Sequence, residues 1–236
     1  MAKREQFLLL LSLRILATSS AAVVSGNSSA LFIFGDSFLD AGNNNYLATS
    51  PLDQANFWPY GETYFGFPTG RFSDGRLISD FIAEFANLTG ILPYLLPGVE
   101  RYRHGVNFAS GGAGALAETF AGDVIDLRTQ LTYFRNVEGY LRKNGNASVK
   151  LMMSRAVFLF SIGSNDYLSK FLMNSSLLNS RELSEYVGIV VGNVTHVVKV
   201  SYLFTNQMKH HCFSGMKDYA AFVDRKYTVS AEENLE

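Results

Sequence analysis

The feature that most constrains the fold is an alternation of short apolar runs with longer segments of helical hydrophobic spacing. Strands are expected in the apolar runs 31–34, 105–109 and 156–161. Amphipathic helices are expected at about 77–88, 126–142 and 181–199. This order is typical of a parallel sheet with helices on its faces, so the predicted fold class is α/β.

The amino-terminal segment resembles a targeting signal. Lys3 and Arg4 precede a Leu-rich run at 7–17, and small residues at 20–22 follow it, so residues 1–25 are predicted to be a signal peptide. A buried amino-terminal helix is the alternative. Five Asn-x-Ser/Thr sequences also favour a secreted, extracellular glycoprotein, and the predicted glycosylation sites are Asn27, Asn87, Asn146, Asn174 and Asn193.

Composition excludes several classes of partner. Hydrophobic residues make up 47% of the 236 residues and charged residues 17%, with a formal net charge of -1, so neither nucleic acid nor an anionic membrane surface is expected as the main partner. No other stretch approaches the ~18 apolar residues of a transmembrane span. Cys212 is the only cysteine, so no internal disulfide can form. We expect no cofactor and no metal site, and the sequence sets no oligomeric state.

Each predicted strand runs directly into a small polar motif. Gly35-Asp36-Ser37 follows the first strand, Ser110-Gly111-Gly112-Ala113-Gly114 the second, and Gly163-Ser164-Asn165-Asp166 the third. The carboxyl ends of parallel strands share one edge of a sheet, where α/β proteins place their chemistry. The three motifs are therefore expected to converge.

Together these motifs could carry out acyl transfer. Ser37 offers a nucleophilic hydroxyl, the glycine turn offers unencumbered backbone N–H groups, and Asn165 offers an amide donor for an oxyanion. Gly-Asp-Ser alone would more simply be a turn with a helix-capping serine. Nucleotide binding at 111–114 is weakly supported, because neither a following Lys-Ser/Thr nor Gly-x-Gly-x-x-Gly is present.

The motifs resemble those of the GDSL esterase/lipases, or SGNH hydrolases, in their plant secreted branch. The resemblance covers about residues 31 to 200, and it also includes a loop rich in aromatics and glycine at 56–76. It implies a three-layer α/β/α fold with a mostly parallel sheet, incomplete at the carboxyl terminus. It further implies Ser37 as nucleophile, and an oxyanion hole formed by the Ser37 N–H, Gly112 (Gly111 as fallback) and Asn165. The aromatic loop is expected either to line a substrate cleft or to pack on the surface.

The sequence departs from this family after about residue 200. The family completes its triad with a late Asp-x-x-His, and neither triad residue is matched in this chain. A solvated residue is expected at His104 and a surface or packing residue at His196, while His210 and His211 lie where the resemblance ends. The further strand expected beyond Ser201 is not evident.

We therefore predict a partial SGNH hydrolase domain at 26–200 and a divergent tail at 201–236. Two functions are compatible with this organisation. One is a secreted serine carboxylester hydrolase acting on lipid or acyl esters. The other is an inactive truncated remnant, or a protein that binds acyl ligands or other proteins.

Export can be tested directly. Expressed in a plant cell, the chain is expected to lose about two dozen amino-terminal residues and to gain N-linked glycans. The measurement is the mass of the secreted protein before and after glycosidase treatment. An intact Met1 and an unchanged mass would contradict the prediction.

Overall fold

The computed structural model describes residues 30–88, 90–98, 102–144, 147–173, 180–205 and 211–213. The predicted signal peptide, three of the five predicted glycosylation sites (Asn27, Asn146 and Asn174) and His210 lie outside these residues.

The described residues contain one parallel sheet of four strands in the order β2-β1-β3-β4. The strands are β1 (Leu31–Gly35), β2 (Gly105–Asn107), β3 (Val157–Ser161) and β4 (His211–Phe213). β1 and β3 pair in register from Leu31 with Val157 to Gly35 with Ser161. The ends of these two strands therefore lie side by side, as the sequence predicted.

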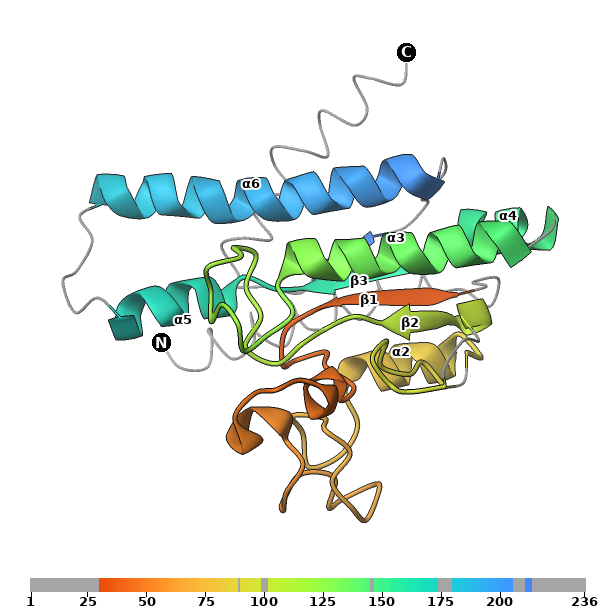
Figure 1. The fold of residues 1–236 in the computed structure, drawn as a ribbon, viewed down its shortest axis with the longest axis horizontal. Helices are drawn as coiled ribbons and strands as arrows, with labels where there is room; N and C mark the ends of the chain where they lie inside the picture. Colours follow the sequence, from red (N-terminus) through yellow and green to blue (C-terminus); the bar gives the residue numbers. More distant parts are fainter. Residues whose placement is uncertain are drawn as a thin grey trace, which may run out of the picture.

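Helices cover both faces of this sheet (Figure 1). α3 (Leu127–Asn144) and α6 (Ser180–Thr205) pack on one face, and α2 (Ile78–Phe85) packs on the other. The remaining elements are the short helices α4 (Ala147–Ser154) and α5 (Ser164–Met173), and the 3-10 turns η1 (Asn43–Tyr46), η2 (Pro51–Gln54) and η3 (Tyr102–His104). The predicted α/β class and helix-covered sheet are confirmed.

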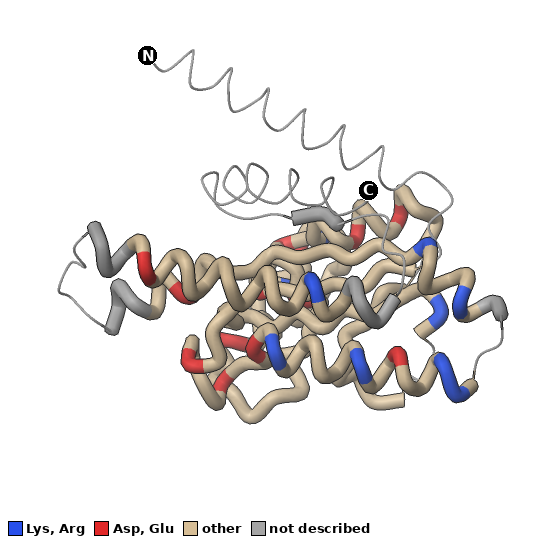
Figure 2. The backbone as a smooth tube through the Cα atoms, turned by 90° about the horizontal axis from the view of Figure 1, so that it is seen from above, with Lys and Arg blue, Asp and Glu red and all other residues tan. Residues whose placement is uncertain are grey.

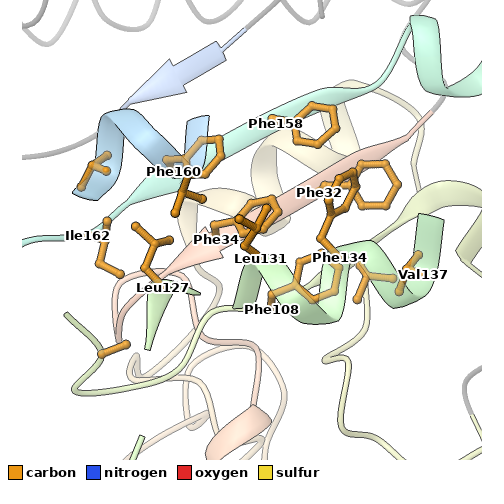
Figure 3. Packing of buried hydrophobic residues seen from close by; sticks show 14 of the residues in the cluster. Phe32, Phe34, Phe108, Leu127, Leu131, Phe134, Val137, Phe158, Phe160 and Ile162 are labelled. Atoms are coloured by element: carbon orange, nitrogen blue, oxygen red, sulfur yellow. The ribbon is translucent and has the colours of Figure 1, made fainter. Parts of the chain in front are cut away.

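The main core is built from phenylalanine rings between the sheet and α3 (Figure 3). Alternation along the strands sends Phe32 and Phe34 of β1 to the same face as Phe158 and Phe160 of β3. Phe134 of α3 packs edge-on against three of these rings, at centroid distances of 5.3, 5.4 and 5.9 Å. This packing orients β1 relative to α3.

The burial of α2 differs from the sequence prediction. We expected its large apolar residues to face the core, but Ile78, Phe81 and Phe85 are 59%, 50% and 61% exposed. The helix buries the small residues Ser79 and Ala83 and packs Ile82 against the core, and Leu77 and Leu88 are buried at its two ends as expected. The stripe formed by Ile78, Phe81 and Phe85 lies on the solvent side of the helix.

Three other elements were not anticipated. α4 and α5 did not stand out in the hydrophobic pattern, and α3 continues to Asn144 beyond its expected end at about residue 142. β4 corrects the expectation that no further strand follows Ser201, because its three residues pair with β3. A strand of this length is set by pairing with a neighbour more than by its own pattern.

Charge is unevenly distributed along the molecule (Figure 2). Arg142 and Lys143 lie in the last turn of α3, whereas Asp166 lies in the first turn of α5, at the end of the molecule that carries the polar turns. None of the described helices is long and apolar enough to cross a membrane. Within the same residues, no three His, Cys, Asp or Glu side chains are grouped to hold a metal ion.

The phenylalanine core makes a testable contribution to stability. Phe34 is fully buried and its ring meets those of four other phenylalanines. Phe34→Ala is expected to lower the free energy of unfolding by about 3–5 kcal/mol, measured by urea denaturation. Phe67→Ala, at a ring that is 60% exposed, is the control and should change it by less than about 0.5 kcal/mol. Equal losses would contradict this account of the core.

Candidate active site

The three polar turns meet at the carboxyl edge of the sheet. The Asp36 N–H donates to the Ser161 carbonyl oxygen at 3.1 Å, and the Ser110 N–H donates to that of Gly35 at 3.1 Å. A Cβ atom at position 35 would overlap the Ser161 carbonyl oxygen, so glycine is required where β1 leaves the sheet beside β3. The convergence predicted from the sequence is confirmed.

A buried amide from α3 holds the end of β1. Gln130 is fully buried; its Oε1 accepts the Gly35 N–H at 2.9 Å, and its Nε2 donates to the Gly35 carbonyl at 2.8 Å. Nε2 also donates to the Ile125 carbonyl at 2.8 Å. Sequence reasoning missed this residue. Its signal was a polar side chain beside Leu127 and Leu131 on the apolar face of the predicted helix.

Asp40 joins the serine turn to the glycine turn. Its Oδ1 accepts the N–H groups of Gly42 and Asn43 at 2.7 Å each, and its Oδ2 accepts the Gly111 N–H at 2.9 Å. Burial raises the pKa of Asp40 to about 6, against the lowering effect of these backbone donors. The carboxyl group thus spans two turns that are 71 residues apart in sequence.

The asparagines that follow are also structural. Asn43 donates to the carbonyls of Asn107 and Ala109, at 3.0 and 2.8 Å. Asn44 donates to the Gly111 carbonyl at 3.0 Å and accepts the Ser110 hydroxyl at 2.6 Å. These buried amides satisfy backbone groups that the sheet leaves unpaired where its strands end.

Ser37 is half-buried, and its own polar groups are not used by the turn. The N–H groups of the next three residues all bond to Asp36, through its Oδ1 or its carbonyl oxygen. By contrast, the Ser37 N–H and hydroxyl have no hydrogen-bond partner among the described residues. Both remain available to a bound molecule.

The glycine turn distinguishes its two candidate donors. Asp40 occupies the Gly111 N–H, and the ring of Phe72, from the predicted aromatic loop, packs where a Gly111 side chain would stand. The Ala113 N–H donates to the Ser110 carbonyl at 3.0 Å. The N–H of Gly112, which has a φ of 82° and is half-buried, has no partner in the described chain. The geometry therefore favours Gly112 over Gly111 as a free donor.

Asn165 lies in the first turn of α5, and its amide is oriented by the glycine turn. Its Nδ2 donates to the Ala113 carbonyl at 2.9 Å, which leaves its second N–H for another acceptor. The preceding residue, Ser164, donates to Asp36 Oδ2 at 3.1 Å. A hydrogen bond between Ser164 and Asp36 therefore joins the turn of Asn165 to the turn of Ser37.

Asp166 fixes α5 to the loop beyond the glycine turn. Its carboxyl group accepts the N–H groups of Ala115 and Leu116 at 2.8 and 3.0 Å, and the Thr119 hydroxyl at 2.7 Å. Gly114 packs so closely against Asp166 and Thr119 that a Cβ atom there would be 2.5 Å from each. Like Gln130, Asp166 positions the turns and was not identified as a site residue from the sequence.

Three turns joined by hydrogen bonds thus carry a hydroxyl at Ser37 and N–H donors at Ser37, Gly112 and Asn165. Such a set can hold a carbonyl group and stabilise the negative charge that develops on its oxygen under attack. Within the described part of the chain, no histidine that could act as a base contacts Ser37. His104 is exposed in η3, ahead of β2, and His196 is exposed on α6. The backbone of His211 pairs with Phe158, three residues before the end of β3.

Comparison with known proteins gives one consistent result. The family model for GDSL-like lipase/acylhydrolase matches residues 31–198. "GDSL esterase/lipase 5" of Arabidopsis thaliana is 57% identical over 202 residues, covering 83% of this chain and 52% of that protein. "GDSL esterase/lipase 1" of the same plant is 58% identical over 179 residues, covering 75% and 48%. "GDSL lipase" of Tanacetum cinerariifolium is 46% identical over 196 residues, covering 83% and 52%. The chain spans about half the length of these relatives.

The buried carboxyl group of Asp36 predicts how the stability of the protein changes with pH. Burial, aided by the charge of Asp166 and opposed by the Phe38 and Ser164 hydrogen bonds, raises the pKa of Asp36 from 3.8 to about 6. Between these values the folded protein retains a proton that the unfolded chain has released. Its free energy of unfolding therefore loses about 1–3 kcal/mol as pH rises from 4 to 6.

Asp36→Asn isolates this effect, because an amide can accept the Phe38 N–H and donate to the Ser164 hydroxyl. The stability of the variant relative to the unsubstituted chain should rise between pH 4 and 6 and then level off. Urea unfolding at pH 4, 5, 6 and 7 measures the difference, to which Asp40 contributes equally in both proteins. A difference independent of pH would show that Asp36 titrates normally.

Proposed function

The chain belongs to the GDSL-like lipase/acylhydrolase family, and from this membership we propose that it is a serine carboxylester hydrolase. Its proposed substrates are lipid or other acyl esters, and the reaction passes through an acyl-serine intermediate. Of the two functions compatible with the sequence, the family and its named relatives support hydrolysis.

The observation that supports the proposal is that the N–H groups of Ser37 and Gly112 have no partner among the described residues, while the glycine turn orients the Asn165 amide through the Ala113 carbonyl. A carbonyl oxygen bound by these three donors would present its carbon to the Ser37 hydroxyl. Donors of this kind each contribute about 2.7–4 kcal/mol to transition-state stabilisation, because they are already oriented when the charge forms.

In the proposed reaction, Ser37 Oγ forms a bond to the carbonyl carbon while its proton passes to a base. The electron pair of the C=O bond moves to the oxygen, which the three donors hold as an oxyanion. Its collapse expels the alcohol, which takes up the proton, and leaves the acyl group on Ser37. Water then attacks the acyl-serine by the same route, so the carboxylic acid is released and Ser37 is restored.

The catalytic base of this reaction has no recognisable counterpart in the 236 residues. The family resemblance implies an Asp-x-x-His, and the printed sequence contains none. Without a base, a serine hydroxyl is a weak nucleophile at neutral pH. The residues described here are therefore proposed to supply the nucleophile and oxyanion half of the machinery.

We place this activity outside the cell. The charged start, the Leu-rich run and the five Asn-x-Ser/Thr sequences support export and glycosylation.

A chimera tests the proposed function. A relative's carboxyl-terminal region with its Asp-x-x-His would be grafted after about Lys199 and assayed with a short-chain nitrophenyl ester. The chimera should turn over the ester, and Ser37→Ala should abolish this turnover. Asn165→Ala should lower kcat by about 10²–10³. The control is Ser154→Ala, at a serine on α4, which should leave the rate unchanged.

The 236-residue chain itself is expected to hydrolyse the ester poorly, at the same rate with and without Ser37→Ala. Loss of a triad member typically removes several orders of magnitude of rate. Strong turnover that depends on Ser37 in this chain would show that one of its own histidines acts as the base. Turnover by the chimera that survives Ser37→Ala would refute the nucleophile.

A further inference from the structure

The exposed stripe of α2 is an apolar surface that the proposed hydrolase function does not explain. Ile78, Phe81 and Phe85 follow one another at helical spacing and are each at least half exposed. The Arg76 guanidinium lies over the Phe81 ring, 4.0 Å from its centre, whereas the Phe85 ring has no such partner among the described residues. An exposed apolar surface that neighbours leave uncovered marks a place where another group can bind. The end of the same helix indicates what that group is.

α2 ends in a Schellman motif with an asparagine at its left-handed position. The Leu88 N–H donates to the Ala83 carbonyl at 2.8 Å, and the Asn87 N–H donates to that of Glu84 at 3.0 Å. Asn87 has a φ of 54°. Glycine is the usual residue here, because side chains in this conformation are strained. The motif fixes the backbone of Asn87 at a defined point beyond the last helical residue.

Asn87 is also the first residue of the sequence Asn87-Leu88-Thr89, the acceptor pattern for N-linked glycans. Its side chain is exposed, and its amide bonds to no other described group. Between Phe85 and Asn87 stands Ala86, which is only 4% exposed. The residue between them therefore faces the core, while both side chains that flank it face solvent.

We propose that Asn87 carries an N-linked glycan whose first sugar lies on the ring of Phe85. A pyranose presents a face of C–H bonds, and these are attracted to the electron-rich face of an aromatic ring. The linked sugar covers the carboxyl-terminal part of the α2 stripe, and its hydroxyl groups make that surface hydrophilic.

The linkage forms by transfer from a lipid diphosphate-linked oligosaccharide during export. The Asn87 amide nitrogen bonds to the anomeric carbon, the lipid diphosphate leaves from that carbon, and the amide loses one proton. No oxidant or reductant is needed. The step depends on the export that the amino-terminal segment predicts, and it does not depend on ester hydrolysis.

Asn193 is the one other predicted acceptor within the described residues, and it is placed differently. It lies within α6, and its Nδ2 donates to the Ile189 carbonyl at 3.0 Å. No left-handed turn sets it apart from the helix, so it serves as the comparison site.

Occupancy is measured first, on the chain secreted from plant cells. Glycosidase treatment in H₂¹⁸O converts a glycosylated Asn87 to ¹⁸O-labelled Asp, which peptide mass spectrometry detects. Thr89→Ala should remove this label while keeping Asn87, and Asn193→Gln should leave it in place. An unmodified Asn87 overturns the proposal, and the state of the other four acceptors then shows whether export failed as well.

Contact with Phe85 is measured second. Enzymatic removal of the glycan should lower the folding equilibrium constant about two- to tenfold in the unsubstituted chain, as expected for one ring contact. Phe85→Leu keeps an apolar side chain without a ring, and should lose most of this effect. Phe67→Leu, at a ring of similar exposure in the loop, should retain it.

An apolar dye supplies a readout that does not require reversible unfolding. Its fluorescence with the unsubstituted chain should rise when the glycan is removed, because the Phe85 surface is uncovered. Equal effects of deglycosylation on the unsubstituted chain and Phe85→Leu, in both measurements, would show that the sugar does not lie on this ring.

Discussion

The structure depends on buried hydrogen bonds that tie three turns together at the carboxyl edge of the sheet. Asp40 bridges the serine and glycine turns, Asp36 meets Ser164, and Asp166 holds the loop after the glycines against α5. Each turn leaves a strand whose backbone groups would otherwise be buried without partners. Because an unpaired buried polar group costs about 1–3 kcal/mol, these side chains fix the turns as well as satisfy them.

The same network determines which backbone donors remain for chemistry. Asp36 and Asp40 take up the N–H groups around Ser37 and at Gly111, and the Ser110 carbonyl takes that of Ala113. Ser37 and Gly112 keep free N–H groups. Free donors therefore result from the satisfaction of their neighbours, and the Asp36 and Asp40 carboxyl groups that satisfy most of them are buried. This preorganisation suits the binding of a developing negative charge.

Burial of the Asp36 and Asp40 carboxyl groups disfavours their charged forms. Asp36 and Asp40 each have a pKa raised to about 6, because desolvation outweighs the hydrogen bonds that they receive. Amides would avoid this cost, but an amide at position 40 would direct N–H groups toward backbone N–H donors. A carboxyl group is the side chain that can accept all three of these hydrogen bonds.

The sequence by itself determined the order of β1, α2, β2, α3, β3 and α6, and it identified the three motifs that carry the candidate site. Hydrophobic periodicity is a local property, and a strand followed by Gly-Asp-Ser can be recognised without knowing its neighbours. The family resemblance placed Ser37, Gly112 and Asn165 in roles that remain predictions.

Tertiary structure alone decided the parts that rest on contacts between distant residues. Phe81 faces outward, where the Arg76 guanidinium lies 4.0 Å from the centre of its ring, and β4 is set by its pairing with β3. The Gly111 N–H is occupied because Asp40, 71 residues away in sequence, accepts it, and this contact is not visible in the sequence. Gln130 appears in sequence as a polar interruption of an apolar face. Only the tertiary structure shows that the Gln130 amide binds the backbone N–H and carbonyl of Gly35. A buried polar side chain needs such partners, and the sequence does not identify them.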